Sequence, residues 1–247
     1  MPRYLVLEIR RMLRDRRFVF FTVAMPVLFY LLWSNVFAAG GKPDPDTGLD
    51  ASTYLLVSMA AFGALGASLT TTGSRLAAER QSGWLRQLQV TPLRPAAVIT
   101  SKIIASMVLA LPAVAMVSLV AALTRHVQLS PGQWAALIAL LWVGTLPFAA
   151  LGTLIGSVVS AAAAQPATIL CYFGLSILGG LWISVSLLPR ALRSIARWTP
   201  SNRFADLGWS VVAGHAPPAS DGLVLAAWTA GLGVLAVLAY RRATVRS

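Results

Sequence analysis

The stretch of sequence that decides the fold is Val127–Pro189, VQLSPGQWAALIALLWVGTLPFAALGTLIGSVVSAAAAQPATILCYFGLSILGGLWISVSLLP, which runs for 63 residues without one charge. As one continuous helix it would be about 95 Å long, whereas the hydrocarbon core of a bilayer is about 30 Å thick. The chain must therefore cross a membrane and return. The small and polar segment Ser157–Pro166 predicts the turn, with one span over 134–156 and the next over 166–188.

The composition of the whole chain agrees with a membrane protein. Hydrophobic residues make up 57% and charged residues 11% of the 247 residues, and the mean hydropathy is +0.73. This apolar content excludes a disordered chain. A single cysteine excludes a disulfide framework, and one cysteine with two distant histidines excludes a structural zinc cluster. We expect no metal site and no catalytic residues.

Other uncharged runs supply the remaining spans, because each needs about 20 apolar residues. We expect an all-α protein with six spans, over residues 18–38, 53–72, 97–123, 134–156, 166–188 and 222–240. The competing interpretation of the first run is a signal peptide, which its length disfavours. Gly152 and Gly156 form a small-xxx-small pattern in the fourth span, which predicts close packing of helices.

The basic residues lie in blocks between the spans, which indicates membrane topology rather than nucleic-acid binding. Thirteen arginines lie in the segments that would be cytoplasmic if both termini are inside, against six basic residues in the external segments. Both termini are therefore expected in the cytoplasm. The segment 189–221 would be external and yet holds four arginines, which are usually found on the cytoplasmic side. An odd number of spans would remove this conflict but would place the C-terminal arginines outside.

Residues 1–17 have the pattern of an amphipathic helix lying on a membrane surface. Leu5, Ile9, Met12 and Leu13 share one face, which could lie at the acyl boundary of the lipids. Another face carries three arginines that could meet anionic headgroups. These anchoring arginines are Arg10, Arg14 and Arg17.

The internal loop 75–94, RLAAERQSGWLRQLQVTPLR, is too short for a domain and too patterned for a simple linker. Gly83 can bend the chain, Trp84 and Leu88 then form an apolar ridge, and Thr91-Pro92 would stop a helix. We expect a short cytoplasmic helix here. The alternative interpretation is a solvated charged turn lying on headgroups.

This loop resembles that of the ABC-2-type permeases, the membrane subunits of one class of ABC exporters. The matching residues are Glu79, Arg80, Gly83, Leu88, Thr91, Pro92 and Leu93, and Lys102 matches a lysine at the start of the following span. The resemblance implies that the loop is a coupling helix docking on a separate ATPase subunit. Trp84 departs from the smaller polar residues usual at its position.

The resemblance continues through the C-terminal third. It implies re-entrant or interfacial helices at the outer face between the fifth and sixth spans, which would accommodate the four arginines there. The matching positions include Gly179, Gly180, Pro189, Trp198 and Pro200.

Two absences limit the energy source. The chain has no G-x-x-x-x-G-K-[ST] motif, so ATP and Mg²⁺ would be bound by the partner subunit. No Asp or Glu lies inside an expected span, which disfavours an ion-coupled secondary transporter. A non-transporting membrane protein that recruits an ATPase remains an alternative.

The resemblance implies the permease subunit of an ATP-driven exporter in the bacterial cytoplasmic membrane, and the missing ATP-binding motif implies that the chain has no enzymatic activity of its own. The resemblance implies two ATPase subunits and a second permease copy, in a homodimer or in a heterodimer with a related permease. It also implies an apolar path along the dimer interface, suited to a drug, antibiotic or lipid. The expected lining comprises Met59, Phe62, Leu65, Leu69, Cys171, Phe173 and Leu175.

Overall fold

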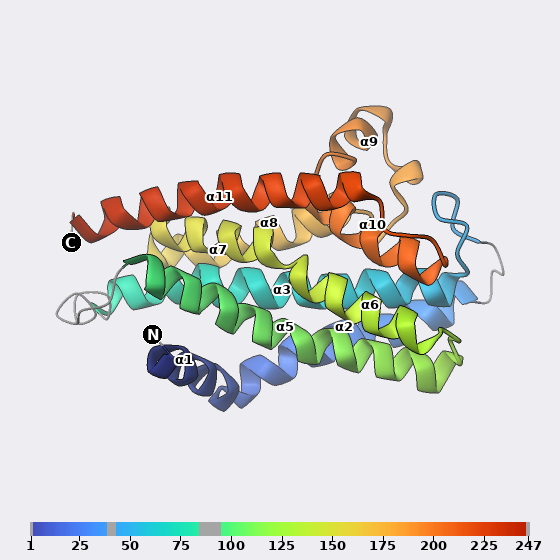
Figure 1. The fold of residues 1–247 in the computed structure, drawn as a ribbon, viewed down its shortest axis with the longest axis horizontal. Helices are drawn as coiled ribbons and strands as arrows, with labels where there is room; N and C mark the ends of the chain where they lie inside the picture. The colour runs from blue at the N-terminus through green and yellow to red at the C-terminus, as the bar shows by residue number, and fades with distance from the viewer. Residues whose placement is uncertain (1, 39–42, 84–94, 246–247) are drawn as a thin grey trace.

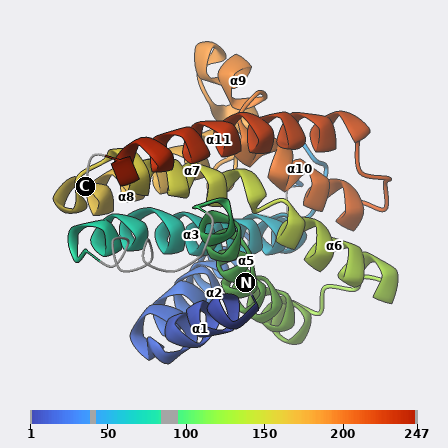
Figure 2. The same cartoon turned by 60° about the vertical axis from the view of Figure 1, so that its left-hand side comes forward.

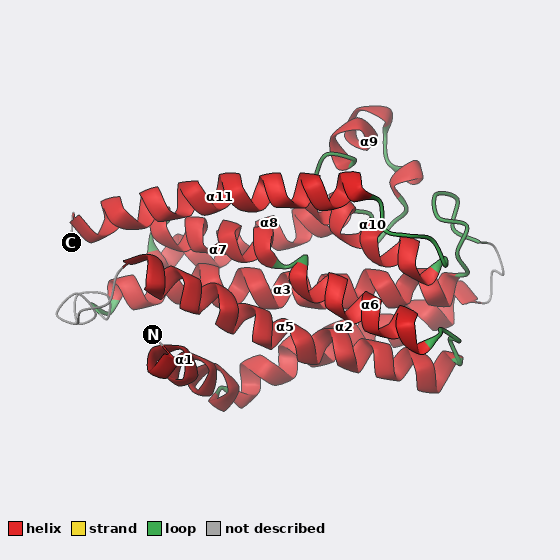
Figure 3. Cartoon of the chain, viewed as in Figure 1, coloured by secondary structure: helices red, strands yellow, loops and turns green. Residues whose placement is uncertain are grey.

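A computed structural model describes residues 2–38, 43–83 and 95–245, and within these ranges it contains helices and no strand (Figure 3). The helices are α1 (Pro2–Arg14), α2 (Arg16–Ala38), α3 (Ala51–Gln81), α5 (Pro95–Arg125), α6 (Pro131–Val143), α7 (Leu146–Val158), α8 (Ala161–Leu178), the 3₁₀ turn η1 (Val185–Leu187), α9 (Arg190–Ala196), α10 (Pro200–Val212) and α11 (Ala219–Val245).

In the described parts of the chain, six helical segments are long and apolar enough to cross a membrane, which confirms the expected all-α fold with six spans. They are Val19–Phe37, Ala51–Gln81, Val98–Arg125, Pro131–Val158, Ala161–Leu178 and Ala219–Tyr240. Both termini lie at the end of the bundle where α3 ends, and α9 projects from the opposite end (Figure 1). We call these the terminal end and the α9 end.

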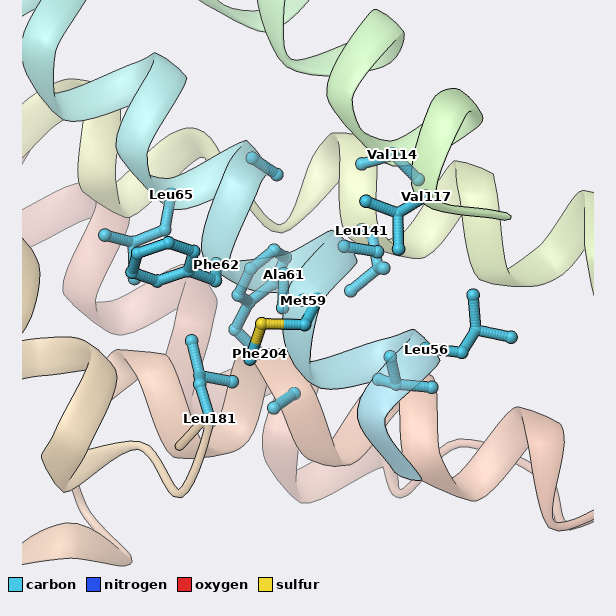
Figure 4. Close-up of a cluster of buried hydrophobic side chains, with 14 of the residues drawn as sticks. Leu56, Met59, Ala61, Phe62, Leu65, Val114, Val117, Leu141, Leu181 and Phe204 are labelled. Carbon is cyan, nitrogen blue, oxygen red and sulfur yellow. The ribbon is translucent and has the colours of Figure 1, made fainter. Parts of the chain in front are cut away.

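Helix α3 is the central element of the bundle, with α2 and α5 on one side and α7 and α8 on the other (Figures 1 and 2). Nearly all its residues from Thr53 to Ala77 are buried. Its apolar side chains form one core with residues of the surrounding helices, such as Val114, Leu141 and Phe204 (Figure 4). A polar helix surface could not be enclosed in this way, since unpaired buried polar groups are costly.

Close contact between α3 and α7 depends on two glycines. A Cβ atom at Gly152 would lie 2.1 Å from Thr72 Oγ1, and one at Gly156 would lie 2.6 Å from the carbonyl oxygen of Gly73. Only a residue without a Cβ lets the two backbones approach this closely. The packing role predicted from the small-xxx-small pattern is confirmed for this pair.

Two helix boundaries differ from the sequence prediction. The fourth span is broken into α6 and α7 at Gly144-Thr145. Pro147 lies in the first turn of α7, directly after this break. A Cβ at Gly144 would lie 2.4 Å from the ring of Phe204, so a glycine at this break leaves room for that α10 side chain. The following turn is shorter than predicted, because α8 begins directly after Ser160 and contains Pro166.

Candidate functional site

The candidate functional site lies where α3 ends, in the region that the loop motif indicated. The predicted cytoplasmic helix does not begin at residue 75, because nothing between Thr72 and Gln81 stops α3. The helix ends instead at Ser82 and at Gly83, whose φ of +74° favours glycine. Glu79 and Arg80 therefore belong to the second span's helix. The motif residues Trp84, Leu88, Thr91 and Pro92 lie outside the described residues.

The side chain of Glu79 is buried inside the bundle. Its Oε2 atom lies 2.5 Å from Lys102 Nζ on α5, and the same ammonium lies 3.0 Å from Glu8 Oε1 on α1. All three side chains are at most 6% exposed. We call Glu8, Glu79 and Lys102 the buried triad.

The buried triad joins three helices through charge. Removing ions from water is expensive, and close pairing with hydrogen bonds offsets that cost. Two carboxylates face one ammonium, and the half-exposed Arg11 guanidinium, 3.5 Å from Glu79 Oε1, supplies a second positive charge. The geometry therefore fixes α1, α3 and α5 relative to one another.

Two neighbouring arginines connect the same two turns of α3 to other elements. Arg80 donates hydrogen bonds to the carbonyl oxygens of Gly156, at 2.9 Å, and Ser157. These carbonyls end α7, where a cation is favourable. Arg75 lies 3.0 Å from the Asp15 carboxylate at the corner between α1 and α2. Arg75, Glu79 and Arg80 thus form a junction with α1, α2, α5 and α7, which we call the α3 junction.

The sequence indicated Glu79, Arg80 and Lys102, but Glu8 was missed. A signal for it was present, because Glu8 lies three residues after Leu5 and four before Met12, on the apolar face of the first helix. An acidic residue on such a face requires a buried partner of opposite charge.

Three of the four predicted apolar residues of α1 pack on protein instead of facing lipid, and the side chain of the fourth, Leu13, lies outside the described residues. Met12 is buried against Ala105 and Leu109 of α5, with Leu5 and Ile9 packed beside it. This contact with α5 covers the part of the stripe formed by Leu5, Ile9 and Met12. Among the predicted anchors, Arg10 and Arg14 are exposed, and the side chain of Arg17 lies outside the described residues.

Most residues predicted to line a path are enclosed by the chain's own helices. Met59, Phe62 and Leu65 lie in the core (Figure 4), and Leu69 is likewise buried. These four side chains therefore do not lie on the outer surface of this chain, although Phe62 lines a hollow beneath it. On α8, Phe173 is 40% exposed, while Cys171 and Leu175 are half-buried.

Two apolar hollows lie between α2, α3 and α8. The smaller, of about 200 Å³, is lined by residues that include Phe21, Met25, Phe62 and Phe173. The larger, of about 830 Å³, lies toward the α9 end and also includes Phe173. The Phe62 ring lines the smaller hollow and stacks on the Tyr172 ring, with ring centroids 4.5 Å apart. It also contacts the Trp182 ring edge-on at 5.2 Å, and Trp182 lines the larger hollow. Aromatic side chains thus divide the two hollows.

The residues predicted at the outer face lie together at the α9 end. Gly180 has a φ of +82°, and its carbonyl oxygen accepts a hydrogen bond from the Tyr54 hydroxyl. The Gly179 carbonyl oxygen accepts a hydrogen bond from Asn202 Nδ2 at 3.3 Å. Pro189 and Pro200 directly precede or begin short helices, and the side chain of Trp198 is 68% exposed.

The fold and composition define a multi-pass α-helical membrane protein without an ATP-binding motif of its own. Residues 41–240 match the ABC-2 family transporter proteins, so the chain belongs to this family. It is 32% identical over 225 residues to the Bacillus subtilis (strain 168) protein named "Putative transport permease YvfS", covering 90% of this chain and 89% of that protein. The chain is thus a membrane permease of the ABC-2 family, whose members generally work with an ATPase subunit.

Proposed function

We propose that this chain is the permease subunit of an ATP-driven exporter in the bacterial cytoplasmic membrane, with both termini in the cytoplasm. A separate ATPase subunit, in two copies, binds ATP and Mg²⁺. A second permease copy, identical or related, completes the transporter. The exported molecule is hydrophobic or amphipathic, as a drug, an antibiotic or a lipid is.

The observation that carries the proposal is the position of the α3 junction. Arg75, Glu79 and Arg80 attach α3 to four other helices within the last two turns before residues 84–94. A movement imposed on that segment by an ATPase would pass directly into α1, α2, α5 and α7. The roles of the motif residues therefore divide into two groups.

The first group would contact the ATPase, and the second would transmit its movement. Gly83, Trp84, Leu88, Thr91 and Pro92 form the first group, because they follow the end of α3. Glu79 and Arg80 form the second group, because their side chains are engaged within the permease. In this proposal both are positioning residues that touch neither ATP nor solute.

The two apolar hollows support a solute path along α2 and α8. Phe173 lines both hollows, and Phe62 lines the smaller one. We propose that the solute passes Phe173, with Cys171 and Leu175 beside it on α8. Buried Met59, Leu65 and Leu69 support the wall from behind.

Purification of the tagged chain from its native membrane in mild detergent tests the ATPase partnership. We expect a stoichiometric ATPase to copurify with the wild type and to be lost from a Trp84→Ala/Leu88→Asp variant. Trp198→Ala is the matched control, because it removes an exposed indole at the α9 end. A chain that purifies alone, or a variant that retains the ATPase like the control, would refute this partnership.

Transport itself distinguishes an exporter from a non-transporting partner that recruits an ATPase. We expect ATP-dependent accumulation of an amphipathic dye in inverted membrane vesicles that contain the complex. Phe173→Ala should change the apparent affinity for the dye without preventing ATPase copurification. An ATPase complex that moves no solute from a broad panel would favour the non-transporting alternative.

A further inference from the structure

A polar hollow of about 390 Å³ lies at the α9 end, between η1, α9, α10 and the segment that precedes α3. Three arginines from consecutive short elements line it: Arg193, Arg197 and Arg203. Such a concentration of cations outside the spans requires explanation, because like charges repel one another across a low-dielectric wall.

The three arginines are not equally neutralised. Arg203 Nη1 lies 2.8 Å from Oδ1 of the buried Asp221, so its charge is balanced. Arg193 Nη2 donates to the carbonyl oxygens of Ser186 and Leu188, which carry no net charge. The guanidinium of Arg197 makes no hydrogen bond or ion pair with any residue in the described part of the chain. Two cations thus line the hollow without a paired carboxylate.

The three arginines of the hollow face two acidic residues in its lining, Asp46 and Asp206. Asp46 keeps its negative charge, and its Oδ2 atom accepts hydrogen bonds from Ser184 Oγ, at 2.5 Å, and from the Ser186 amide, at 2.7 Å, while it forms no ion pair with Arg193 or Arg197. Burial, together with the neighbouring Asp221 carboxylate, raises the pKa of Asp206 to about 6, although Arg203 opposes this shift, so Asp206 is still mostly ionised at pH 7. The lining thus holds three arginines against two aspartates, and this excess of positive charge favours an anion.

The larger apolar hollow, of about 830 Å³, adjoins this polar one. Tyr54 lines both hollows. Asp46 and Val185 line the polar hollow and are close in sequence to Asp44 and Ser184, which line the apolar one. Its other walls are apolar and aromatic, with Trp33, Phe37, Leu55, Phe173, Ile177 and Trp182. A volume of this size suits a drug-sized ligand, since such pockets measure roughly 300–1,000 Å³.

We infer that the two hollows together bind an anionic amphiphile of drug-like size, with its acidic group at Arg193 and Arg197 and its apolar part against Trp33, Trp182 and Phe173. The inference rests on the proposed function, because it assigns this chemical class to the exported solute. A wholly apolar solute would gain nothing from the two cations. A cationic one would be repelled by them.

Binding to the full chain in nanodiscs of zwitterionic lipid, without an ATPase, tests the inference. The probe is decyl sulfonate below its micellar concentration, measured by equilibrium dialysis, with decyltrimethylammonium and decyl maltoside as controls for the headgroup. We expect saturable binding of the sulfonate and at least about tenfold weaker binding of the other two, which equals ~1.4 kcal/mol.

Arg197→Gln should weaken sulfonate binding about tenfold, as expected for the loss of one charged hydrogen-bonding partner. Arg190→Gln is the matched control, because Arg190 is exposed at the start of α9 and does not line the hollow. Equal binding by both variants would overturn the inference, and so would equal loss in both, which would indicate only general surface charge. Equal binding of the three headgroups would overturn it as well.

A second arm distinguishes a solute from a membrane lipid as the natural occupant. Nanodiscs that contain phosphatidylglycerol should leave the affinity for the sulfonate within about threefold of its value in zwitterionic discs. Abolished binding would overturn the inference, since the occupant would then be a lipid. Because this assay contains no ATPase, its failure alongside successful ATPase copurification would refute the substrate class and leave the proposed function intact.

Discussion

Substituting Lys102 by Met should disrupt the α3 junction more than any other single substitution in the buried triad. The ammonium lies 2.5 Å from Glu79 and 3.0 Å from Glu8, and both carboxylates are almost completely buried. Methionine preserves most of the side-chain volume but leaves two enclosed carboxylates facing each other. The half-exposed Arg11 would be the remaining neighbouring cation of the cluster.

The structure ranks three substitutions by cost. Breaking a buried pair by removing one partner costs about 3–5 kcal/mol, which is the expectation for Lys102→Met. Glu79→Gln should cost about 1–3 kcal/mol, because the remaining Glu8–Lys102 pair is balanced and the amide still hydrogen-bonds. Arg11→Gln should cost less than about 1 kcal/mol, because its guanidinium is half exposed and screened by solvent.

Unfolding in mixed micelles of dodecyl maltoside and SDS measures these differences at a common SDS fraction. The double variant Glu79→Gln/Lys102→Met should be less destabilised than the sum of the single variants, because it leaves one unpaired carboxylate instead of two. The reasoning would be refuted if Lys102→Met unfolds within about 1 kcal/mol of the wild type. Simple additivity in the double variant would also refute it, because the charges would then be independent.

Three further outcomes are expected. Gly152→Ala should destabilise the protein by about 1–3 kcal/mol, since the added Cβ would lie 2.1 Å from an α3 atom, whereas Gly231→Ala, with nothing within 4 Å, should be neutral or stabilising in the same micelle assay. Arg80→Gln should weaken the α7 contact and lower transport per ATP hydrolysed, and unchanged coupling in the vesicle assay would contradict a transmitting role. The raised pKa of Asp206, about 6, means that the folded protein binds its proton more tightly than the unfolded chain does. Stability should therefore increase as the pH falls from 7 through 6, and thermal unfolding of Asp206→Asn should lack this part of the pH dependence.

The number of spans could be predicted from sequence because it depends on a one-dimensional property. Uncharged runs such as Val127–Pro189 must leave water, and their length alone fixes how often the chain crosses. The glycine pattern at Gly152 and Gly156 was also predictive, since close helix contact needs small residues wherever it occurs. Neither inference requires knowing which helices are neighbours.

The predictions that differ from the structure concern features that depend on which helices are neighbours. Met59 and Phe62 were assigned to a path between two subunits on the family resemblance, and both are buried within the chain. Their helix is apolar on every side, so sequence does not tell which of its faces are covered. Pro166 was assigned to a turn, but Ser160 begins α8 before it. The ion pair between Glu8 and Lys102 joins residues 94 positions apart, which no local pattern specifies.

The two candidate sites lie at opposite ends of one helix, which suggests how they work together. Helix α3 has 31 residues and so is about 46 Å long, with packed neighbours along nearly all of it. Glu79 engages the α3 junction at one end, while Tyr54 lines both hollows near the other and hydrogen-bonds to the Gly180 carbonyl oxygen. A closely packed helix without an internal proline moves as a unit more readily than it bends. Displacement of the α3 junction by the proposed ATPase partner would therefore move the Tyr54 wall, and it would couple ATP hydrolysis to the shape of the two hollows without any further relay.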